Sequence, residues 1–331
     1  MLAHLMRFVC PACKGSLAFT SNLYSCSTCR RDFPVVAGIP DFRLTPDPYI
    51  GIQEDRDKGL RLLDASTTRG FEALVRYYYA ITPDHPPDLA ERRVRHALAE
   101  VALARFALED ARLGGTTPPG PLLDIGCSTG ALLNGAAGRF APLVGVDVAF
   151  RWLVVGAVRL REAGVDATLV CANAEALPFP DGTFAAVTAT DTIEHVSDVA
   201  ASASECHRVL APDGVTYWST NNRYAPLPEP HIGVWGVGYR PRARQREFVA
   251  RRRTDLRPYL VQLRSASELD RVFRVAGFRH TAVTAAPLFA PHYDHPVLSR
   301  ALRLYNVMRR LPVARSVARV IGPRLSVRAR R

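Results

Sequence analysis

The sequence has no apolar run long enough to cross a membrane and no recognisable export signal. Its 331 residues contain no uninterrupted apolar stretch that approaches the roughly 18–20 residues of a membrane-spanning helix. The N-terminal residues lack the long apolar core and the small-residue cleavage site of a secretory signal. We therefore expect a cytoplasmic protein whose thiols are reduced.

Lysine is scarce throughout, and acidic residues are missing from the C-terminal end. Lysine occurs only at Lys14 and Lys58, so arginine carries most of the positive charge behind the formal net charge of +12. No acidic residue follows Asp294, whereas ten arginines lie between positions 300 and 331, and a second arginine cluster spans positions 240 to 257. Such clusters favour anionic partners such as RNA, other phosphates or a membrane surface. A solvated basic tail is the alternative.

Four of the seven cysteines form two CxxC pairs. Cys10 and Cys13 are separated by twelve residues from Cys26 and Cys29. Two such pairs on a small hairpin can place four thiolates tetrahedrally around Zn²⁺, and the metal then supplies folding energy that so short a segment lacks. Because four protein ligands leave no open coordination position, we predict a structural zinc site; a redox dithiol pair is the alternative.

Composition and periodicity divide the chain into four segments. Residues 1–45 form the predicted zinc ribbon, and residues 46–117 form a helical linker or cap with helical periodicity over 55–81 and 88–113. Residues 118–290 form the main domain, with a Gly-, Pro- and aromatic-rich insertion at 222–262. Residues 291–331 form a basic amphipathic tail, a helix pair broken by Pro312. The tail suits either an anionic membrane surface, with the protein peripheral to it, or packing on the domain.

Strands and helices alternate along the main domain. Strands are predicted near 121–125, 143–147, 167–171, 184–190, 214–220 and 279–285, and helices near 130–138, 150–163, 198–210 and 265–278. This alternation predicts an α/β fold with a Rossmann-like, doubly wound, mostly parallel sheet, preceded by the small ribbon and the helical segment. Ligands of such sheets bind at the carboxyl ends of the strands.

Two of these strand ends have the pattern of a nucleoside-binding site. An apolar strand ends at Asp124 and Ile125 and runs into a turn bounded by Gly126 and Gly130. Glycine lets a ligand approach the backbone where a Cβ would block it. The next strand ends at Asp147, where an acid is the usual partner of ribose hydroxyls. Together the two strand ends predict a nucleoside-containing cofactor.

Five motifs follow one another along the main domain: LDIGCSTG at 123–130, VGVD at 144–147, NAEALPFPDGTF at 173–184, DTIEHV at 191–196 and ECHRVLAPDG at 205–214. In this order they resemble class I S-adenosylmethionine-dependent methyltransferases of the type 11 group that includes quinone-biosynthesis enzymes. The resemblance covers roughly residues 118–225 and departs from the family pattern at Ser128, where glycine is usual, at Asn173, where an acid is usual, and at Ala185, where an aspartate is common. The CxxC ribbon, closing on Val36–Pro40, also resembles ribbons fused to methyltransferases, including some that act on ribosomal RNA.

The resemblance implies S-adenosyl-L-methionine as the cofactor and gives its contacts. The implied cofactor-binding residues are Asp124, Gly126, Cys127, Ser128, Gly130, Asp147, Val148, Asn173, Ala174 and Asp191. Asn173 is expected to bond the adenine amino group through its amide oxygen.

Glu194 and His195 are the candidate catalytic residues. An acceptor hydroxyl must lose a proton, and the ordinary pKa of histidine, about 6.5, makes His195 the best candidate base; a purely local or pocket-lining role is the alternative. Glu194 is expected to orient His195 or to help hold a divalent cation. The insertion is expected to be a substrate lid, with a packed loop as the alternative. The candidate acceptor contacts are Tyr78, Arg223, His231, Trp235 and Tyr239.

Three functions are therefore open from the sequence. The leading one is an S-adenosylmethionine-dependent methyltransferase that O-methylates a small-molecule, quinone-like or lipid-like metabolite. The second is an RNA methyltransferase that uses the zinc ribbon and the arginine clusters. The third is a non-catalytic binding protein that keeps the cofactor fold.

Overall fold

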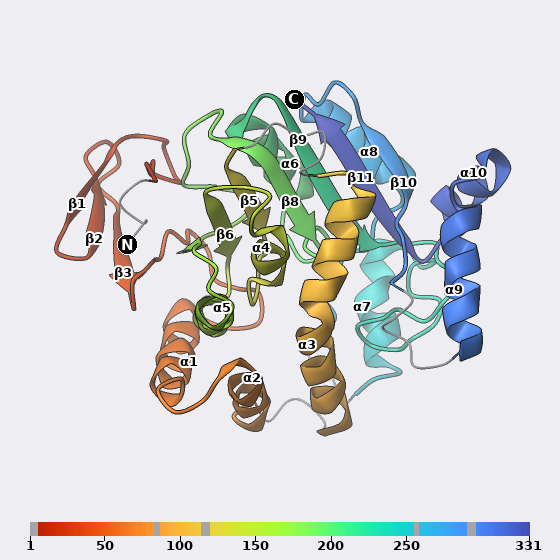
Figure 1. Ribbon diagram of the computed structural model, residues 1–331, viewed down its shortest axis with the longest axis horizontal. Helices are drawn as coiled ribbons and strands as arrows, with labels where there is room; N and C mark the ends of the chain where they lie inside the picture. The colour runs from red at the N-terminus through yellow and green to blue at the C-terminus, as the bar shows by residue number, and fades with distance from the viewer. Residues whose placement is uncertain (1–5, 83–86, 114–119, 255–257, 290–295) are drawn as a thin grey trace. The chain divides into compact units, whose positions relative to one another are not determined.

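The computed structural model describes residues 6–82, 87–113, 120–254, 258–289 and 296–331 (Figure 1). The chain divides into two compact units. The first unit comprises residues 1–188, 198–215 and 331, and the second comprises residues 189–197 and 216–330. Strands β8 (Phe184–Thr190) and β9 (Leu210–Asn221) run from one unit into the other.

The first unit opens with a four-stranded antiparallel sheet over the predicted ribbon. Its strands are β1 (Leu17–Thr20), β2 (Leu23–Cys26), β3 (Asp32–Val36) and β4 (Ile39–Pro40). An aromatic cluster fills the space beneath them, with the rings of Phe8 and Phe42 centred 5.2 Å apart. Just beyond β4, the backbone N–H of Phe42 donates to the carbonyl of Cys171 at 2.7 Å. The ribbon is therefore joined directly to the edge of the main sheet.

The main sheet of the first unit is parallel, as the alternation of elements predicts. Its strands follow the order β8-β5-β6-β7, where β5 is Leu122–Ile125, β6 is Leu143–Asp147 and β7 is Thr168–Cys171. Helices α4 (Ala131–Ala136), α5 (Phe150–Glu162) and α6 (Val199–Val209) alternate with the strands. Both faces of β5 are buried, which explains its continuous apolar sequence. The predicted α/β class with a mostly parallel sheet is confirmed.

The helical segment differs from its prediction in one respect. The periodicity over residues 55–81 contains two helices, α1 (Ile52–Ala65) and α2 (Phe71–Ala80), which are separated by a turn that ends at Gly70. Helix α1 packs against α5 at Gly59, where an added Cβ would lie 2.4 Å from the ring of Phe150. The third helix, α3 (Pro87–Asp110), covers most of the predicted range.

The second unit contains the insertion and the tail. Its strand order is β10-β11-β9, with β10 (Ala282–Ala285) antiparallel to β11 (Arg324–Arg330). Strand β11 lies where a continuous basic tail was expected. The helices are α7 (Arg242–Ala250), α8 (Ala266–Val275), α9 (Pro296–Met308) and α10 (Pro312–Ile321), so the break at Pro312 lies where it was predicted. Among the described residues, no helix is long and apolar enough to span a bilayer.

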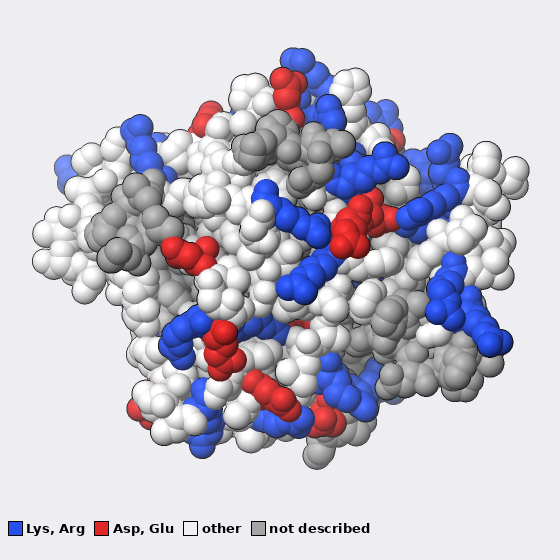
Figure 2. Space-filling model, viewed as in Figure 1, with Lys and Arg blue, Asp and Glu red and all other residues white. Residues whose placement is uncertain are grey.

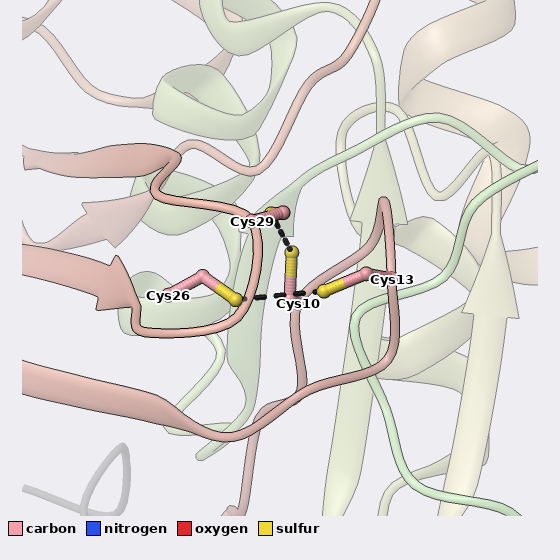
Figure 3. A group of neighbouring side chains, drawn as sticks. All are labelled: Cys10, Cys13, Cys26 and Cys29. Atoms are coloured by element: carbon pink, nitrogen blue, oxygen red, sulfur yellow. Dashed lines mark hydrogen bonds between the residues drawn. The ribbon is translucent and has the colours of Figure 1, made fainter.

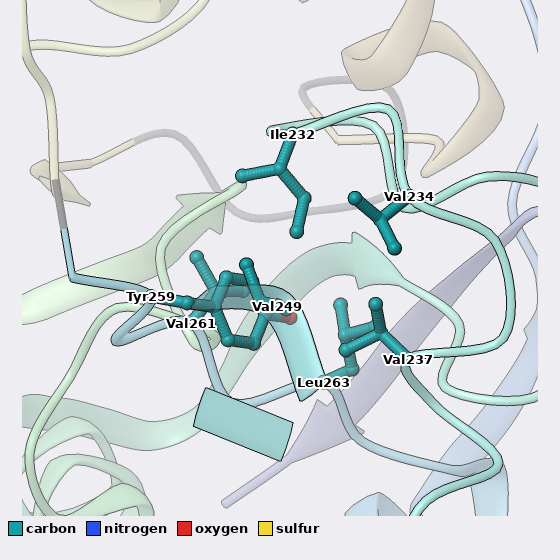
Figure 4. Close-up of a cluster of buried hydrophobic side chains, with 7 residues drawn as sticks. All are labelled: Ile232, Val234, Val237, Val249, Tyr259, Val261 and Leu263. Carbon is teal, nitrogen blue, oxygen red and sulfur yellow. The ribbon is translucent and has the colours of Figure 1, made fainter. Parts of the chain in front are cut away.

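The insertion has a hydrophobic core of its own (Figure 4). Seven buried side chains from its loop, from α7 and from the segment after it pack together: Ile232, Val234, Val237, Val249, Tyr259, Val261 and Leu263. This packing makes the insertion an ordered part of the second unit.

Candidate active site

The predicted cofactor turn combines three left-handed residues. Gly126, Ser128 and Gly130 have φ angles of +71°, +46° and +70°. Glycine adopts this region readily, whereas Ser128 pays a steric cost there. The turn places the backbone N–H of Ser128 2.8 Å from Asp147 Oδ2, to which it donates.

Two acids lie beside this turn, Asp124 near the end of β5 and Asp147 at the end of β6. Asp147 also accepts from the backbone N–H of Ala149 at 2.8 Å, and Asp124 accepts from the hydroxyl of Thr188 at 2.8 Å. Burial raises the pKa of Asp147 to about 6 and that of Asp124 to about 7. Both acids lie at the carboxyl ends of adjacent parallel strands, where the sequence predicts that the cofactor binds with its ribose beside the turn.

Asn173, the predicted adenine contact, is bonded to the segment that follows the ribbon. Its Oδ1 accepts from the backbone N–H of Leu44 at 2.8 Å and of Thr45 at 3.2 Å. Its Nδ2 donates to the Thr45 carbonyl at 3.2 Å and to the Thr45 hydroxyl at 2.9 Å. An adenine contact through the oxygen of Asn173 would have to displace one of these bonds, and it stays a prediction, as does the contact at Ala174.

A buried ionic network next to this segment was not found from the sequence. Arg43 contacts both oxygens of Asp41, at 2.8 and 2.6 Å, lies 2.7 Å from Asp55 and donates to the carbonyl of Val148 at 3.1 Å. The side chains of Arg43 and Asp55 are fully buried. Val148 directly follows Asp147, so Arg43 helps to fix the backbone beside the predicted ribose acid.

In the second unit, Glu194, His195 and His231 come together. Each offers one ligand atom, and these atoms all lie within 4.8 Å of one another. The two imidazoles meet edge to face with ring centroids 5.0 Å apart. His231, expected only as an acceptor contact, therefore joins the two residues expected to be catalytic. Glu194 and His231 lie far apart in the sequence, and no local pattern links them.

Hydrogen bonds to neighbouring side chains fix two of these three side chains. His231 Nδ1 lies 2.5 Å from a carboxylate oxygen of Glu229, which leaves Nε2 to face a ligand. Glu194 is fully buried and accepts from the Thr220 hydroxyl at 2.7 Å and from the amide of Asn221 at 3.3 Å. Burial raises the pKa of Glu194 to about 7. Burial alone would lower the pKa of His231, but its bond to Glu229 and the negative charges of Glu229, Glu194 and Asp191 together outweigh burial and raise that pKa.

Asp191 is engaged within the second unit rather than standing free. It has a φ of +53°, its N–H donates to the carbonyl of Ser219 at 2.9 Å, and its carboxylate pairs with Arg324. Its predicted role at the cofactor stays a prediction.

A cavity of about 530 Å³ lies beside this cluster, and its walls are largely apolar. Its lining includes Glu229, which contacts His231, and Asn221, which contacts Glu194. It also includes Arg324, which pairs with Asp191. Arg223 and Tyr239 line it too, as expected of acceptor contacts. The other lining residues include Leu227, Val237, Leu263, Leu288, Leu302 and Tyr305.

The remaining candidate acceptor residues are placed differently. Tyr78 is buried in the first unit, with its ring centroid 4.1 Å from that of Trp152. Trp235 is 63% exposed and does not line the cavity. Arg223 lies in the cavity wall, but its guanidinium also donates to the Gly238 carbonyl at 2.9 Å and pairs with Glu268 at 3.3 Å.

The four ribbon cysteines form one near-tetrahedral cluster (Figure 3). The sulfur atoms of Cys10 and Cys29, and those of Cys13 and Cys26, are each 3.5 Å apart. Four sulfurs at a Zn–S distance of about 2.3 Å are separated by about 3.8 Å. The cluster therefore fits a zinc ion with little adjustment.

Comparison with known proteins identifies the central part of the chain. Residues 123–218 match the family model for a methyltransferase domain. The chain is 39% identical over 106 residues to a ubiquinone biosynthesis O-methyltransferase of Thiobacillus denitrificans, covering 31% of this chain and 45% of that protein. It is 37% identical over 117 residues to the enzyme of the same name from Pseudomonas paraeruginosa, covering 35% and 48%. Residues 123–218 thus resemble a methyltransferase domain, and the chain spans about half the length of these curated relatives.

Solved structures give weaker likenesses. Phosphoethanolamine N-methyltransferase 2 of Haemonchus contortus matches with a TM-score of 0.46 and 19% identity, covering 69% of this chain and 52% of that chain. An S-adenosylmethionine-dependent methyltransferase from Mesorhizobium loti matches with a TM-score of 0.47 and 21% identity, covering 67% and 96%. At TM-scores below 0.5, neither likeness bears on the reaction of this protein.

Proposed function

We propose that this protein is an S-adenosylmethionine-dependent methyltransferase that O-methylates a small-molecule or lipid-like acceptor. The observation that carries the proposal is the left-handed turn over Gly126–Gly130 beside Asp147, inside a segment that matches a methyltransferase domain. Asp147 would hold the ribose hydroxyls, and the turn would receive the rest of the cofactor on its backbone. The printed name of these relatives, ubiquinone biosynthesis O-methyltransferase, supports an oxygen acceptor.

The cluster of Glu194, His195 and His231 supports O-methylation in particular. A hydroxyl becomes a good nucleophile when its proton is removed, and the cluster offers a carboxylate and two imidazoles for that task. Glu229 holds the His231 ring so that Nε2 stays available to accept the proton or bind a ligand. Glu194, His195 and His231 also form a ligand set suited to a divalent cation, which when bound would lower the pKa of the acceptor hydroxyl.

The acceptor is proposed to occupy the cavity beside this cluster. Its apolar walls suit an acceptor with a hydrophobic body. Two of its polar lining residues, Asn221 and Glu229, are hydrogen-bonded to Glu194 and His231 of the cluster. With the cofactor already activated as a sulfonium, alignment and exclusion of water account for much of the catalysis.

Cofactor binding is tested by isothermal titration with S-adenosylmethionine. The wild-type protein should bind, and Asp147→Asn should weaken binding about tenfold or more because a charged hydrogen-bond acceptor is lost. Asp166→Asn, at an exposed position of the same unit, is the matched control and should bind normally. Absence of binding by the wild-type protein would overturn the proposal.

Methyl transfer is tested with isotope-labelled cofactor in cell extract, with mass spectrometry to identify the molecule that gains the methyl group. Glu229→Gln should lower turnover about 10- to 100-fold while leaving cofactor affinity unchanged, since its carboxylate holds the His231 ring and lines the cavity proposed for the acceptor. Chelation followed by addition of Mg²⁺ or Mn²⁺ separates the two roles of the cluster. Restored activity indicates a cation, and activity that survives chelation assigns proton removal to the side chains alone.

We also propose that Cys10, Cys13, Cys26 and Cys29 hold a structural Zn²⁺ in this ribbon. The sulfur spacing supports it, and the four ligands leave no position for a substrate. Elemental analysis of the purified protein should find one equivalent of zinc.

A further inference from the structure

The end of the chain carries an unusual concentration of exposed apolar side chains. Of the seventeen large apolar side chains that are exposed in the described residues, eight lie between positions 304 and 321. In α9 they recur at helical spacing and continue into the connection, and in α10 they recur again on one stripe. They are Leu304, Val307, Met308, Leu311, Val313, Val317, Val320 and Ile321, and we call them the tail stripe.

Helix α9, which carries the first part of the tail stripe, is held in place by its other face. In α9, Leu302 is buried, the hydroxyl of Tyr305 donates to the Ala286 carbonyl at 3.2 Å, and Asn306 donates to the Leu288 carbonyl at 2.6 Å. Arg309 donates to the Ala285 carbonyl at 2.9 Å. The α9 part of the stripe is therefore presented by an anchored helix. None of the ten residues of α10 is buried.

The charge around the tail stripe has one sign. Arg303, Arg310, Arg315 and Arg319 are exposed among the apolar positions. No acidic residue occurs from position 295 to the end of the chain. On the face seen in Figure 2, the edge where Figure 1 draws α9 and α10 carries basic side chains and no acidic ones.

We propose that α9 and α10 form a docking surface for an anionic lipid bilayer. Apolar side chains at the spacing of one helix face, flanked by arginines, match a helix that lies in the membrane interface. The apolar residues enter the acyl boundary while the arginines meet lipid phosphates. Each helix is too short to cross the bilayer, which leaves it in the plane of the surface.

The observations favour a bilayer over the two other candidate occupants. RNA is bound by phosphate contacts together with aromatic stacking, and the tail stripe contains no aromatic residue. A second copy of the chain would bring two sets of exposed arginines against each other without any acid to pair them.

Docking there would also bring the cavity close to a source of apolar acceptors. Ala301, Leu302 and Tyr305 of α9 line the cavity described above. The same helix thus exposes one face outward and closes the cavity with another. This consequence rests on the proposed function, whereas the docking surface does not.

The test is co-sedimentation of the full-length protein with vesicles of phosphatidylcholine alone or with phosphatidylglycerol added. The protein should bind the phosphatidylglycerol vesicles at least about tenfold more tightly, and rising salt should weaken binding. Val313→Asp combined with Val317→Asp should reduce binding about tenfold or more, because two apolar contacts are replaced by negative charges that the anionic lipid repels. Arg315→Gln combined with Arg319→Gln should remove most of the preference for phosphatidylglycerol.

Val275→Asp is the matched control, because Val275 is an isolated apolar residue, 78% exposed, on α8. It should bind vesicles as the wild type does, and circular dichroism should show every variant folded. The proposal is overturned if the wild type ignores both kinds of vesicle, or if the Val313 and Val317 variant binds unchanged. It is also overturned if those substitutions abolish only self-association or only RNA binding. Cofactor titration on the same samples reports the proposed function separately.

Discussion

Asp55 is the residue whose replacement tests the buried ionic network most directly. Its carboxylate is fully buried and lies 2.7 Å from Arg43 and 2.6 Å from Arg151, and it accepts from the backbone N–H of Phe150 at 2.8 Å. The network is balanced, since Asp41, Asp47 and Asp55 face Arg43, Arg56 and Arg151. Asp55→Asn keeps the volume but leaves one buried positive charge without its counter-charge.

The expected loss is about 3–5 kcal/mol in the free energy of unfolding, the usual cost of breaking a buried pair from one side. That loss is a large part of the roughly 5–15 kcal/mol that a folded domain possesses. Urea denaturation at pH 7 measures it. The control is Glu72→Gln, which removes an ion pair with Arg76. The side chains of Glu72 and Arg76 are 52% and 46% exposed, so this substitution should lower the free energy of unfolding by less than about 1 kcal/mol. A loss for Asp55→Asn as small as that of the control would refute the reasoning.

Three further substitutions test other parts of the structure. Ser128→Gly should raise the free energy of unfolding by up to about 1 kcal/mol, because φ is +46° at this position. It should leave cofactor affinity unchanged, because Ser128 bonds Asp147 through its backbone N–H. Thermal melting and titration calorimetry measure the two effects, and a destabilised variant contradicts the prediction. Burial acts to raise the pKa of Glu268, but its bonds to Arg242 and Ser265 outweigh this and lower it to about 2. Its stabilising effect is then fully present above the ordinary glutamate pKa of about 4.3 and disappears as the pH falls toward 2, so the stability gap between wild type and Glu268→Gln should close over that window; a gap independent of pH contradicts it. Cys13→Ser should lower the zinc content and the melting temperature together, and a variant with full zinc content would show that the cluster does not need this ligand.

The elements that the sequence predicts well are those with a local signal. The strands β5 to β8 are short apolar runs between turns, and they appear close to their predicted positions. Strand β11 was missed although Leu325, Val327 and Ala329 alternate and are buried. That period-two signal lies in an arginine-rich tail whose overall composition favoured helices.

The parts of the site that could not be predicted depend on contacts between distant segments. Arg43 and Asp55 are single charged residues with no motif around them, and Arg151, a partner of Asp55, lies almost a hundred positions beyond it. The pairing of Glu194 with His231 likewise requires the fold of the insertion. Sequence periodicity reports which face of an element is buried, but it carries no information about which distant side chain meets it.

The asparagine at position 173 has a physical explanation in the segment that follows the ribbon. The side chain must accept from two backbone N–H groups at Leu44 and Thr45 and must also donate to the Thr45 carbonyl. An ionised aspartate can accept at this position but has no proton to donate, so the Thr45 carbonyl would face a carboxylate oxygen instead of an N–H. Only an amide of this size satisfies both requirements. The segment that follows the ribbon therefore accounts for an asparagine, rather than an acid, just beyond the end of β7.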